Sequence, residues 1–333
     1  MNDRPFAIYL NANARHVSPE VVSRIEELVH PEDIFFAATR DDADRFARVI
    51  LARGYPTVFT GGGDGTVVGL INALRKVAGP EGAAIPTLGV LSLGTGNALS
   101  RLVSSAGALS DLKAYVTNPS RDVWTISLME HEGALHPFGS LGADAEMMAD
   151  YHRLKDRVGA GRLKPLFQNV TGYFAAFFAA TLPRHVGQAL RGERLEVRIT
   201  NLGESAYRIG PEGRKTRFFG PGEILYEGPV VLTILGTVPV FGYGLRLLPW
   251  ADRDPDMMQL RMSNIPVAAS LVHLPAAWNG TLQHEQLQDF YVQRVRIRYS
   301  RPMPFQLSGD FEGMRDTVEV AVRPRAVRLL RFI

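Results

Sequence analysis

Residues 60–66 read TGGGDGT and directly follow a short run of β-forming residues, YPTVF. Glycine loses the most conformational entropy on folding, so this stretch cannot stabilise a packed element by itself. A glycine run between a strand and a helix lets backbone N–H groups converge on an anion at the positive end of the helix dipole. The alternative is a plain turn with Asp64 as a helix cap, although four glycines are a large entropic cost for a turn. The stretch predicts a strand, a phosphate-binding loop and a helix.

A second glycine loop, LGTGNALSR at residues 93–101, follows the next predicted strand. Thr95 and Asn97 can hydrogen-bond a ligand there, or they can cap the following helix, because both residue types are common caps. Neighbouring glycine loops at the carboxyl ends of strands form the crevice in which open α/β sheets bind nucleotides. Their glycine spacing fits neither a Walker loop nor a dinucleotide fingerprint.

The first hundred residues alternate strand-like and helix-like runs. FAIYLNA and IFFAAT have the composition of buried strands, and each precedes a helix-like run, SPEVVSRIEELV and DDADRFARVILARG. Ser18 is a predicted N-cap and Gly54 a predicted helix stop. Repeated strand–loop–helix units predict an α/β nucleotide-binding domain with a doubly wound, mostly parallel sheet and helices on both faces.

The pattern changes after about residue 120. Residues 194–200, 294–300 and 317–322 read RLEVRIT, RVRIRYS and TVEVAV, in which apolar and polar residues alternate. Such period-two runs predict antiparallel sheets with one solvent-exposed face. We therefore expect an α/β domain over residues 1–122 and a β-rich, β-sandwich-like antiparallel domain over 123–333, whose last strands can return to the first domain.

Composition excludes several classes of function. The chain has 333 residues, a formal net charge of +3 and no cysteine, so disulfides and thiolate catalysis are excluded. The small positive excess does not indicate nucleic acid binding but suits an anionic surface or ligand. The histidines show no zinc-ligand spacing. The most apolar run, VTGYFAAFFAATL, is shorter than the roughly 20 residues of a spanning helix. We expect a soluble or peripheral protein.

Five segments together resemble one known family. They are GGDGT (62–66), LGTGNALSR (93–101), SLGADAEMM (140–148), YGLRLLPWADRDPDMMQLRM (243–262) and FQLSGDFEG (305–313). They are similar to motifs of the diacylglycerol kinase catalytic-domain family, which includes sphingosine and ceramide kinases and bacterial lipid kinases. The resemblance implies a nucleotide domain, a β-sandwich domain and an active site between them. It also implies an ATP- and Mg²⁺-dependent kinase that phosphorylates a hydroxyl of a membrane lipid.

The resemblance also implies roles for particular residues. Asp64 would organise Mg²⁺ and ATP. The late motif would supply the catalytic base from Asp310 or Glu312, and Asp144 would recognise the lipid hydroxyl. Asp254 or Asp256 matches a structural cation position. The residues expected around the nucleotide are Asn11, Thr39, Gly62, Gly63, Gly65, Thr66, Gly94, Thr95 and Asn97.

The chain also departs from the family pattern. The first loop reads NANAR, so Asn11 is present but the usual proline and glycine are missing. Gly69 stands where a glutamate is usual, and Phe311 stands where the late motif has glycine. Ala98 and Thr125 replace aspartates common in bacterial diacylglycerol kinases, which favours the sphingosine and ceramide branch. Diacylglycerol-like and sphingoid or ceramide substrates both stay open.

Two other functions stay open at this point. An NAD kinase shares the GGDGT motif, although the second loop and Arg101 argue against it. A lipid-binding pseudokinase would explain Gly69, Phe311 and the altered first loop.

An apolar segment suggests how the protein meets a lipid. Residues 165–182 are rich in phenylalanine, including Phe174 and Phe177, and are flanked by cationic side chains, which are Arg162, Lys164 and Arg184. This pattern is typical of a segment that lies on an anionic bilayer surface. We expect a cytoplasmic protein peripherally associated with the membrane, and a homodimer is compatible with the sequence.

Overall fold

The computed structural model describes residues 5–79, 84–94, 97–103, 105–119, 122–158, 170–241 and 244–332. The chain forms two compact units. The N-terminal unit comprises Met1–Ser127, Gly242–Gly244 and Arg325–Ile333, and the C-terminal unit comprises Leu128–Phe241 and Leu245–Pro324.

A parallel sheet forms the centre of the N-terminal unit. Its neighbouring strands run in the order β2-β1-β3-β4, and the far end of β16 adds a parallel contact at Leu329 beside Leu88 of β4. The strands are β1 (Ala7–Asn11), β2 (Ile34–Ala37), β3 (Thr57–Gly62) and β4 (Thr87–Ser92). β3 is buried throughout and ends directly in the glycine loop. The predicted parallel sheet is confirmed.

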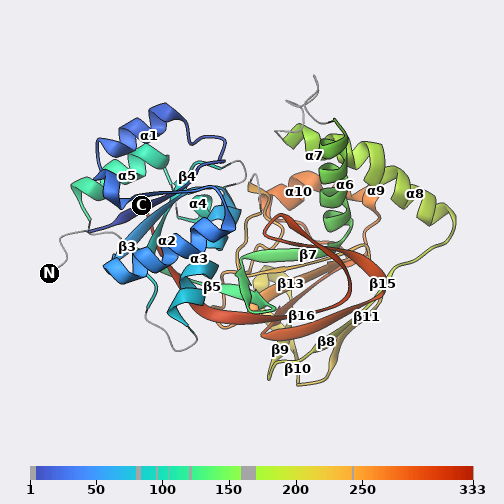
Figure 1. Cartoon of the computed structure of the whole chain (residues 1–333). Coiled ribbons are helices and arrows are strands. Elements are labelled where there is room, and N and C mark those ends of the chain that lie inside the picture. The colour runs from blue at the N-terminus through green and yellow to red at the C-terminus, as the bar shows by residue number, and fades with distance from the viewer. Residues whose placement is uncertain are drawn as a thin grey trace. The chain divides into compact units, whose positions relative to one another are not determined.

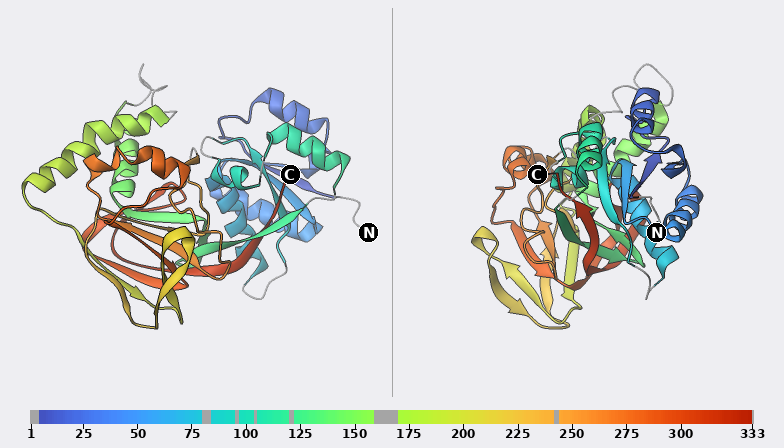
Figure 2. Two further views of the ribbon diagram at one scale, coloured as in Figure 1. Left: turned by 180° about the vertical axis from the view of Figure 1, so that it is seen from behind. Right: turned by 90° about the vertical axis from the view of Figure 1, so that its left-hand side faces the viewer.

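Helices lie on both faces of this sheet (Figures 1 and 2). Their bounds are α1 (Pro19–Glu26), η1 (Pro31–Asp33), α2 (Arg40–Arg53), α3 (Asp64–Ala78), α4 (Ala98–Leu102) and α5 (Ala108–Thr117). α1 and α5 share one apolar core with Ile8 and Leu10 of β1. Tyr9, between those two residues, points the other way and contacts Phe46 of α2 at 6.5 Å between ring centroids. Alternation along β1 therefore separates the two helix layers.

Two predicted helix ends are present. The Ser18 side chain accepts the N–H of Val21 at the start of α1, and Pro19 is the first helical residue. Gly54 ends α2 with a φ of 68°, in the left-handed region that suits glycine.

The C-terminal unit is built on antiparallel strands. Neighbours run in the order β10-β9-β14-β13-β12-β7-β15-β16, and β8 pairs with both β15 and β11. The strands are β6 (Ala134–His136), β7 (Phe138–Gly142), β8 (Glu196–Asn201), β9 (Ala206–Ile209), β10 (Lys215–Phe219), β11 (Ile224–Pro229), β12 (Leu232–Gly236), β13 (Met258–Ser263), β14 (Leu287–Val292) and β15 (Arg294–Leu307). Two long strands run through both units, β5 (Val123–His131) and β16 (Asp310–Leu330).

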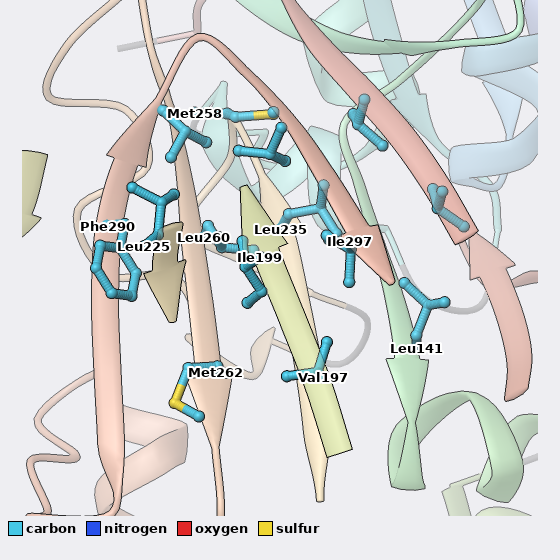
Figure 3. Close-up of a cluster of buried hydrophobic side chains, with 14 of the residues drawn as sticks. Leu141, Val197, Ile199, Leu225, Leu235, Met258, Leu260, Met262, Phe290 and Ile297 are labelled. Atoms are coloured by element: carbon cyan, nitrogen blue, oxygen red, sulfur yellow. The ribbon is translucent and has the colours of Figure 1, made fainter. Parts of the chain in front are cut away.

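The strands enclose one large apolar core (Figure 3). Ile199 of β8 and Ile297 of β15 are register partners, and both are fully buried. Leu260 of β13 and Phe290 of β14 are likewise register partners, and both belong to the same apolar core. In the first part of β15, Val295, Ile297 and Tyr299 are buried and alternate with exposed arginines, as the sequence predicts. The predicted β-sandwich-like architecture is confirmed.

Helices complete the C-terminal unit (Figure 1). They are α6 (Ala143–Val158), α7 (Val170–Ala176), the π-helix η3 (Phe177–Thr181), α8 (Leu182–Leu190), the short η4 (Pro211–Gly213), α9 (Val267–Ser270) and α10 (Leu274–Asn279). No helix in the described part of the chain is both long and apolar enough to cross a bilayer. Arg162 and Lys164, predicted to flank an apolar segment, lie outside the described residues.

Candidate functional site

Three loops of the N-terminal unit follow three neighbouring strands. Asn11 ends β1, Gly62 ends β3, and Gly94 comes shortly after β4. Because β1, β3 and β4 are adjacent and parallel, their carboxyl ends meet at the same sheet edge. The structure therefore brings the two glycine loops together at the edge where open α/β sheets bind ligands.

The two glycine loops approach so closely that side chains are excluded. A Cβ on Gly94 would lie 2.2 Å from the Gly63 Cα and 2.5 Å from its nitrogen. A Cβ on Gly62 would lie 2.3 Å from the Thr66 hydroxyl oxygen. These contacts involve backbone or the rigid first turn of α3, so a side chain at either position would force the loops apart. The glycines serve contact between the loops as well as access for a ligand.

Asp64 joins the two loops through its carboxylate. Oδ2 accepts the N–H of Ala98 and Oδ1 the N–H of Leu99, both at 2.9 Å. Asp64, 34 residues before Ala98 in the chain, thus accepts the free backbone N–H groups in the first turn of α4. Burial raises the pKa of the carboxyl group, and the two N–H donors oppose that rise.

Asn97 closes the second loop on itself. Its side-chain oxygen accepts the Gly94 N–H at 3.1 Å, and its Nδ2 donates to the Gly94 carbonyl at 2.9 Å. Asn97 has a φ of 51°, which asparagine tolerates better than most residues. Its side chain makes no cap bond to α4, because Asp64 fills that role.

The first loop contacts both glycine loops. Asn11 Nδ2 donates to the Thr66 hydroxyl at 3.0 Å, and His16 Nδ1 lies 3.2 Å from the Gly94 carbonyl oxygen. The Asn11 carbonyl group of the side chain also accepts the N–H of Asn13. His16 was not predicted, since no local pattern singles it out.

The first turn of α3 has the features of a phosphate site. Gly63 and Gly65 present backbone without side chains, and Gly65 is exposed. The following α3 is a 15-residue helix, so its positive end favours an anion. These features favour an anionic group such as a phosphate.

The side chains around the same loop are less suited to coordinating Mg²⁺ than its backbone is to binding a phosphate. Both Asp64 oxygens already accept backbone N–H groups. Among the residues that the structure describes, no three His, Asp or Glu side chains are grouped to hold a metal ion. The role of Asp64 as a magnesium ligand stays a prediction.

Thr39 and Thr95 were also predicted to lie near the nucleotide. Thr39 is the N-cap of α2, and its hydroxyl accepts the Asp42 N–H at 3.1 Å while Asp42 bonds back to the Thr39 backbone. The structure shows Thr39 in a capping box and leaves its nucleotide contact a prediction. Thr95 lies outside the described residues.

In the C-terminal unit, the predicted catalytic acids lie on a β-hairpin. Leu307 of β15 pairs with Asp310 of β16 across a two-residue turn, Ser308–Gly309. The φ values of 56° and 92° belong to a type I′ turn, the usual connection of a tight hairpin. Asp310 directly follows the turn, Glu312 comes two residues later, and both are exposed.

Asp144 begins α6 close to this hairpin. Gly142 turns the chain from β7 into the helix with a φ of 91°, and an added Cβ there would lie 2.5 Å from the Val231 carbonyl oxygen. Asp144 Oδ2 accepts from the Ser140 hydroxyl at 2.5 Å and from Gln306 Nε2 at 3.3 Å. Burial raises the pKa of Asp144, and these two donors partly oppose the rise.

His152, also on α6, is a residue that the sequence did not single out. Burial lowers its pKa, Lys155 lowers it further, and the negative charge of Asp310 acts in the opposite direction. The imidazole therefore lies within electrostatic range of the predicted base. Tyr151 next to it stacks on Tyr173 of α7 at 4.0 Å between ring centroids.

The predicted structural cation position is elsewhere in this unit. Asp254 pairs with Lys215 at 2.6 Å and accepts the backbone N–H of Asp256 at 3.0 Å. The lysine supplies the positive charge that a cation would bring. A cation at Asp254 or Asp256 stays a prediction.

Solved structures share this architecture along the whole chain. A candidate diacylglycerol kinase from Bacillus anthracis str. Sterne has a TM-score of 0.67 at 14% identity and covers 99% of this chain and 97% of its own. A second structure from the same organism, described as diacylglycerol kinases, has a TM-score of 0.62 at 12% identity with the same coverage. At these identities the likeness shows the fold.

Comparison of the sequence with known proteins also finds diacylglycerol kinases. Diacylglycerol kinase 2 of Arabidopsis thaliana is 23% identical over 175 residues, covering 46% of this chain and 24% of that protein's length. Residues 8–126, which contain both glycine loops, match the family model of the diacylglycerol kinase catalytic domain. Residues 8–126 are therefore similar to the catalytic domain of diacylglycerol kinases.

Proposed function

We propose that the protein is an ATP-dependent lipid kinase that transfers the γ-phosphoryl group to a hydroxyl of a membrane lipid. The observation that carries the proposal is the pair of glycine loops joined by Asp64, within the stretch that matches the kinase family. Gly63 and Gly65 leave the backbone at the positive end of α3 open to close approach, which supports the binding of a nucleotide phosphate there.

The N-terminal unit would bind and orient the nucleotide. The N–H groups of the first turn of α3, from Gly63 to Gly65, would meet the phosphates. Thr66, whose hydroxyl already accepts a bond from Asn11, would add a donor. Phosphoryl transfer depends mostly on such positioning and on stabilisation of charge.

Mg²⁺ enters the proposal as the counterion of ATP. Magnesium in kinase sites is commonly held by substrate phosphates, water and one or two carboxylates, and its charge offsets that of the phosphates. Because Asp64 is engaged with α4, its part would be to keep the two glycine loops joined.

The hairpin supports Asp310 rather than Glu312 as the proposed base. A D-G-E motif read on the hairpin places its glycine in the turn, where the φ of Gly309 is 92°. The motif then corresponds to Ser308-Gly309-Asp310, and Phe311 no longer occupies a glycine position. Asp310 would accept the lipid hydroxyl proton as that oxygen attacks the γ-phosphorus. The bond from the γ-phosphorus to the bridging oxygen breaks, and ADP leaves.

A lipid acceptor is supported by exposed apolar side chains on the helices of the C-terminal unit. Phe174 is 39% and Phe178 54% exposed on α7 and η3, and Leu190 at the end of α8 is 84% exposed. Val272 and Trp278, near α9 and on α10, are 79% and 37% exposed. Exposed apolar side chains gathered on helices suit the surface of a bilayer.

The test is a transfer assay with γ-labelled ATP and Mg²⁺ against four acceptors. Diacylglycerol, sphingosine and ceramide are presented in mixed micelles, and NAD in solution. The expected product is a labelled lipid, and its identity decides between the diacylglycerol and sphingoid branches. Label on NAD alone would indicate an NAD kinase. Lipid binding without label transfer, in a folded protein that binds ATP, would indicate a pseudokinase.

A further inference from the structure

A buried glutamine connects the two acidic positions of the C-terminal unit. Gln306 lies on β15 with 1% of its surface exposed. It is the register partner of Ser140 on β7 and of Phe311 on β16. Gln306 thus lies between the strand that leads into Asp144 and the strand that carries Asp310.

The two ends of the Gln306 amide bond different elements. Nε2 donates to the Ser140 hydroxyl at 2.9 Å and to Asp144 Oδ2 at 3.3 Å. Oε1 accepts the backbone N–H of Gly309 at 2.8 Å. Gly309 is the second residue of the turn and immediately precedes Asp310.

The orientation of the amide is fixed by its neighbours. A reversed amide would place the carbonyl oxygen against a carboxylate and the NH₂ group against the Gly309 N–H. Glutamate would retain the acceptor for Gly309 but bring a second carboxylate to Asp144. An uncharged amide of this length satisfies both ends without an added proton, and buried donors or acceptors left unpaired are strongly disfavoured.

Other contacts hold the first turn residue. Ser308 N–H donates to the Phe138 carbonyl at 3.0 Å, and its hydroxyl lies 3.1 Å from His136 Nδ1. The backbone N–H of Gly309 is instead held by the side chain of Gln306. Loss of Gln306 should therefore leave the hairpin in place while freeing its far end, where Asp310 begins β16.

We propose that Gln306 is a positioning residue that locks the turn bearing Asp310 to Asp144, so that the base and the hydroxyl-binding acid keep a fixed geometry. The inference rests on the proposed lipid kinase function. Misplacement of a reacting group by about 1 Å can cost on the order of a hundredfold in rate, so a small change at Gly309 suffices to lower activity.

The experiment compares three variants of the full chain. Gln306→Met removes all three hydrogen bonds of the amide at similar volume, and Gln306→Glu keeps the acceptor for Gly309 but loses the two amide donor bonds. Gln259→Met is the matched control. Gln259 is 0% exposed, donates to Asp289 and accepts the Trp250 N–H, but it does not contact the turn. Each variant is measured for melting temperature, kcat and KM with lipid and ATP, and exchange of the Gly309 amide hydrogen.

The expected results separate positioning from stability. Gln306→Met should lower kcat tenfold or more with little change in the KM for ATP, and Gly309 should lose its protection from exchange. Gln306→Glu should keep that protection but move the acid limb of the kcat/KM profile to higher pH, because two adjoining carboxylates hold a proton more tightly. Gln259→Met should lower the melting temperature without these changes.

Three results would overturn the inference. They are an unchanged kcat in Gln306→Met, unchanged Gly309 exchange in that variant, or an equal kcat loss in Gln259→Met. If the unaltered protein phosphorylates no lipid, the proposed function fails, while the exchange measurement still decides whether Gln306 holds the turn.

Discussion

The carboxylate of Asp64 accepts the backbone N–H of Leu99, which lies 35 residues later in the chain. With the matching bond to Ala98, it makes the two glycine loops one mechanical unit. Asp64, which the sequence predicts to serve a metal, therefore has backbone partners in the second loop as well. Variants of Asp64 must be tested for both roles.

Asp64→Asn should lower phosphoryl transfer at least a hundredfold and also destabilise the protein by about 1–3 kcal/mol, the usual cost of an unpaired buried polar group. The amide can accept from only one of the two N–H groups and turns a donor toward the other. Steady-state kinetics and thermal unfolding test both effects. Asp44→Asn, which removes a surface pair with Lys76, is the control and should change neither. Near-normal turnover in a folded Asp64→Asn protein would remove Asp64 from the site.

Gly94→Ala should weaken ATP binding at least tenfold, because the new methyl group would meet the backbone of Gly63. Gly69→Ala is the opposite case, since Gly69 is exposed in α3 and nothing lies within 4 Å of an added Cβ. It should raise stability by about 0.5–1 kcal/mol, as glycine does when replaced in a helix. Isothermal titration with ATP and chemical unfolding measure the pair. Equal ATP affinity in Gly94→Ala would contradict the close contact of the loops.

Asp310→Asn should depress kcat by two orders of magnitude or more with little change in ATP affinity, because a base acts on the acceptor. Glu312→Gln should be milder, since it is farther from the turn. If the two acids act together, the double variant should be little worse than Asp310→Asn alone. Turnover at saturating ATP and lipid tests this order. A larger effect at Glu312 would return the motif to its Asp310-Phe311-Glu312 alignment.

His136 should make stability depend on pH. Burial, and secondarily the charge of His131, lower its pKa from 6.5 to about 4. Between these values the unfolded chain binds a proton that the folded chain does not, so the free energy of unfolding falls as pH drops from 6.5 toward 4. At about 1.4 kcal/mol per pKa unit, the loss is up to about 3 kcal/mol. Denaturant unfolding at pH 7 and pH 4.5 should show a smaller difference in His136→Asn. An identical difference would place the titrating group elsewhere.

If the exposed rings of Phe174 and Phe178 contact the membrane, their loss should affect activity on vesicles most. The double variant Phe174→Ser, Phe178→Ser should lose activity on anionic vesicles several-fold more than on a short-chain soluble lipid. Phe177 was predicted to share this role, but it is only partly exposed and packs edge-on against Phe178 at 5.2 Å between ring centroids. Phe177→Ser should therefore also lower the melting temperature. Phe218, 55% exposed on β10 and edge-on to Tyr207, is the control for an exposed ring outside these helices. Equal losses on both lipids would contradict a membrane role.

Local signals predicted the fold well. The cap at Ser18, the left-handed stop at Gly54 and the alternation of β15 each depend on neighbouring residues, and the structure contains all three. The site depended on contacts distant in sequence. The Gln306 bond to Ser140 joins residues 166 positions apart, and no local pattern indicates it.

The tight turn at Ser308–Gly309 is a second feature that the local sequence does not reveal, for a different reason. Aligned by residue type, the late motif has Phe311 at a glycine position. Backbone conformation instead assigns the turn to Ser308 and Gly309. A two-residue turn can be found from sequence only when both flanking strands are paired correctly, and the β15–β16 register contains irregularities.

The course of β16 has a consequence for synthesis of the protein. This strand begins at Asp310 in the C-terminal unit, and its last residues, from Arg325, belong to the N-terminal unit. There Leu329 pairs beside Leu88, and Leu330 enters the core. The N-terminal unit cannot be completed on the ribosome when its own first 127 residues emerge. It must wait, with the edge of β4 unprotected, until nearly two hundred further residues have been translated.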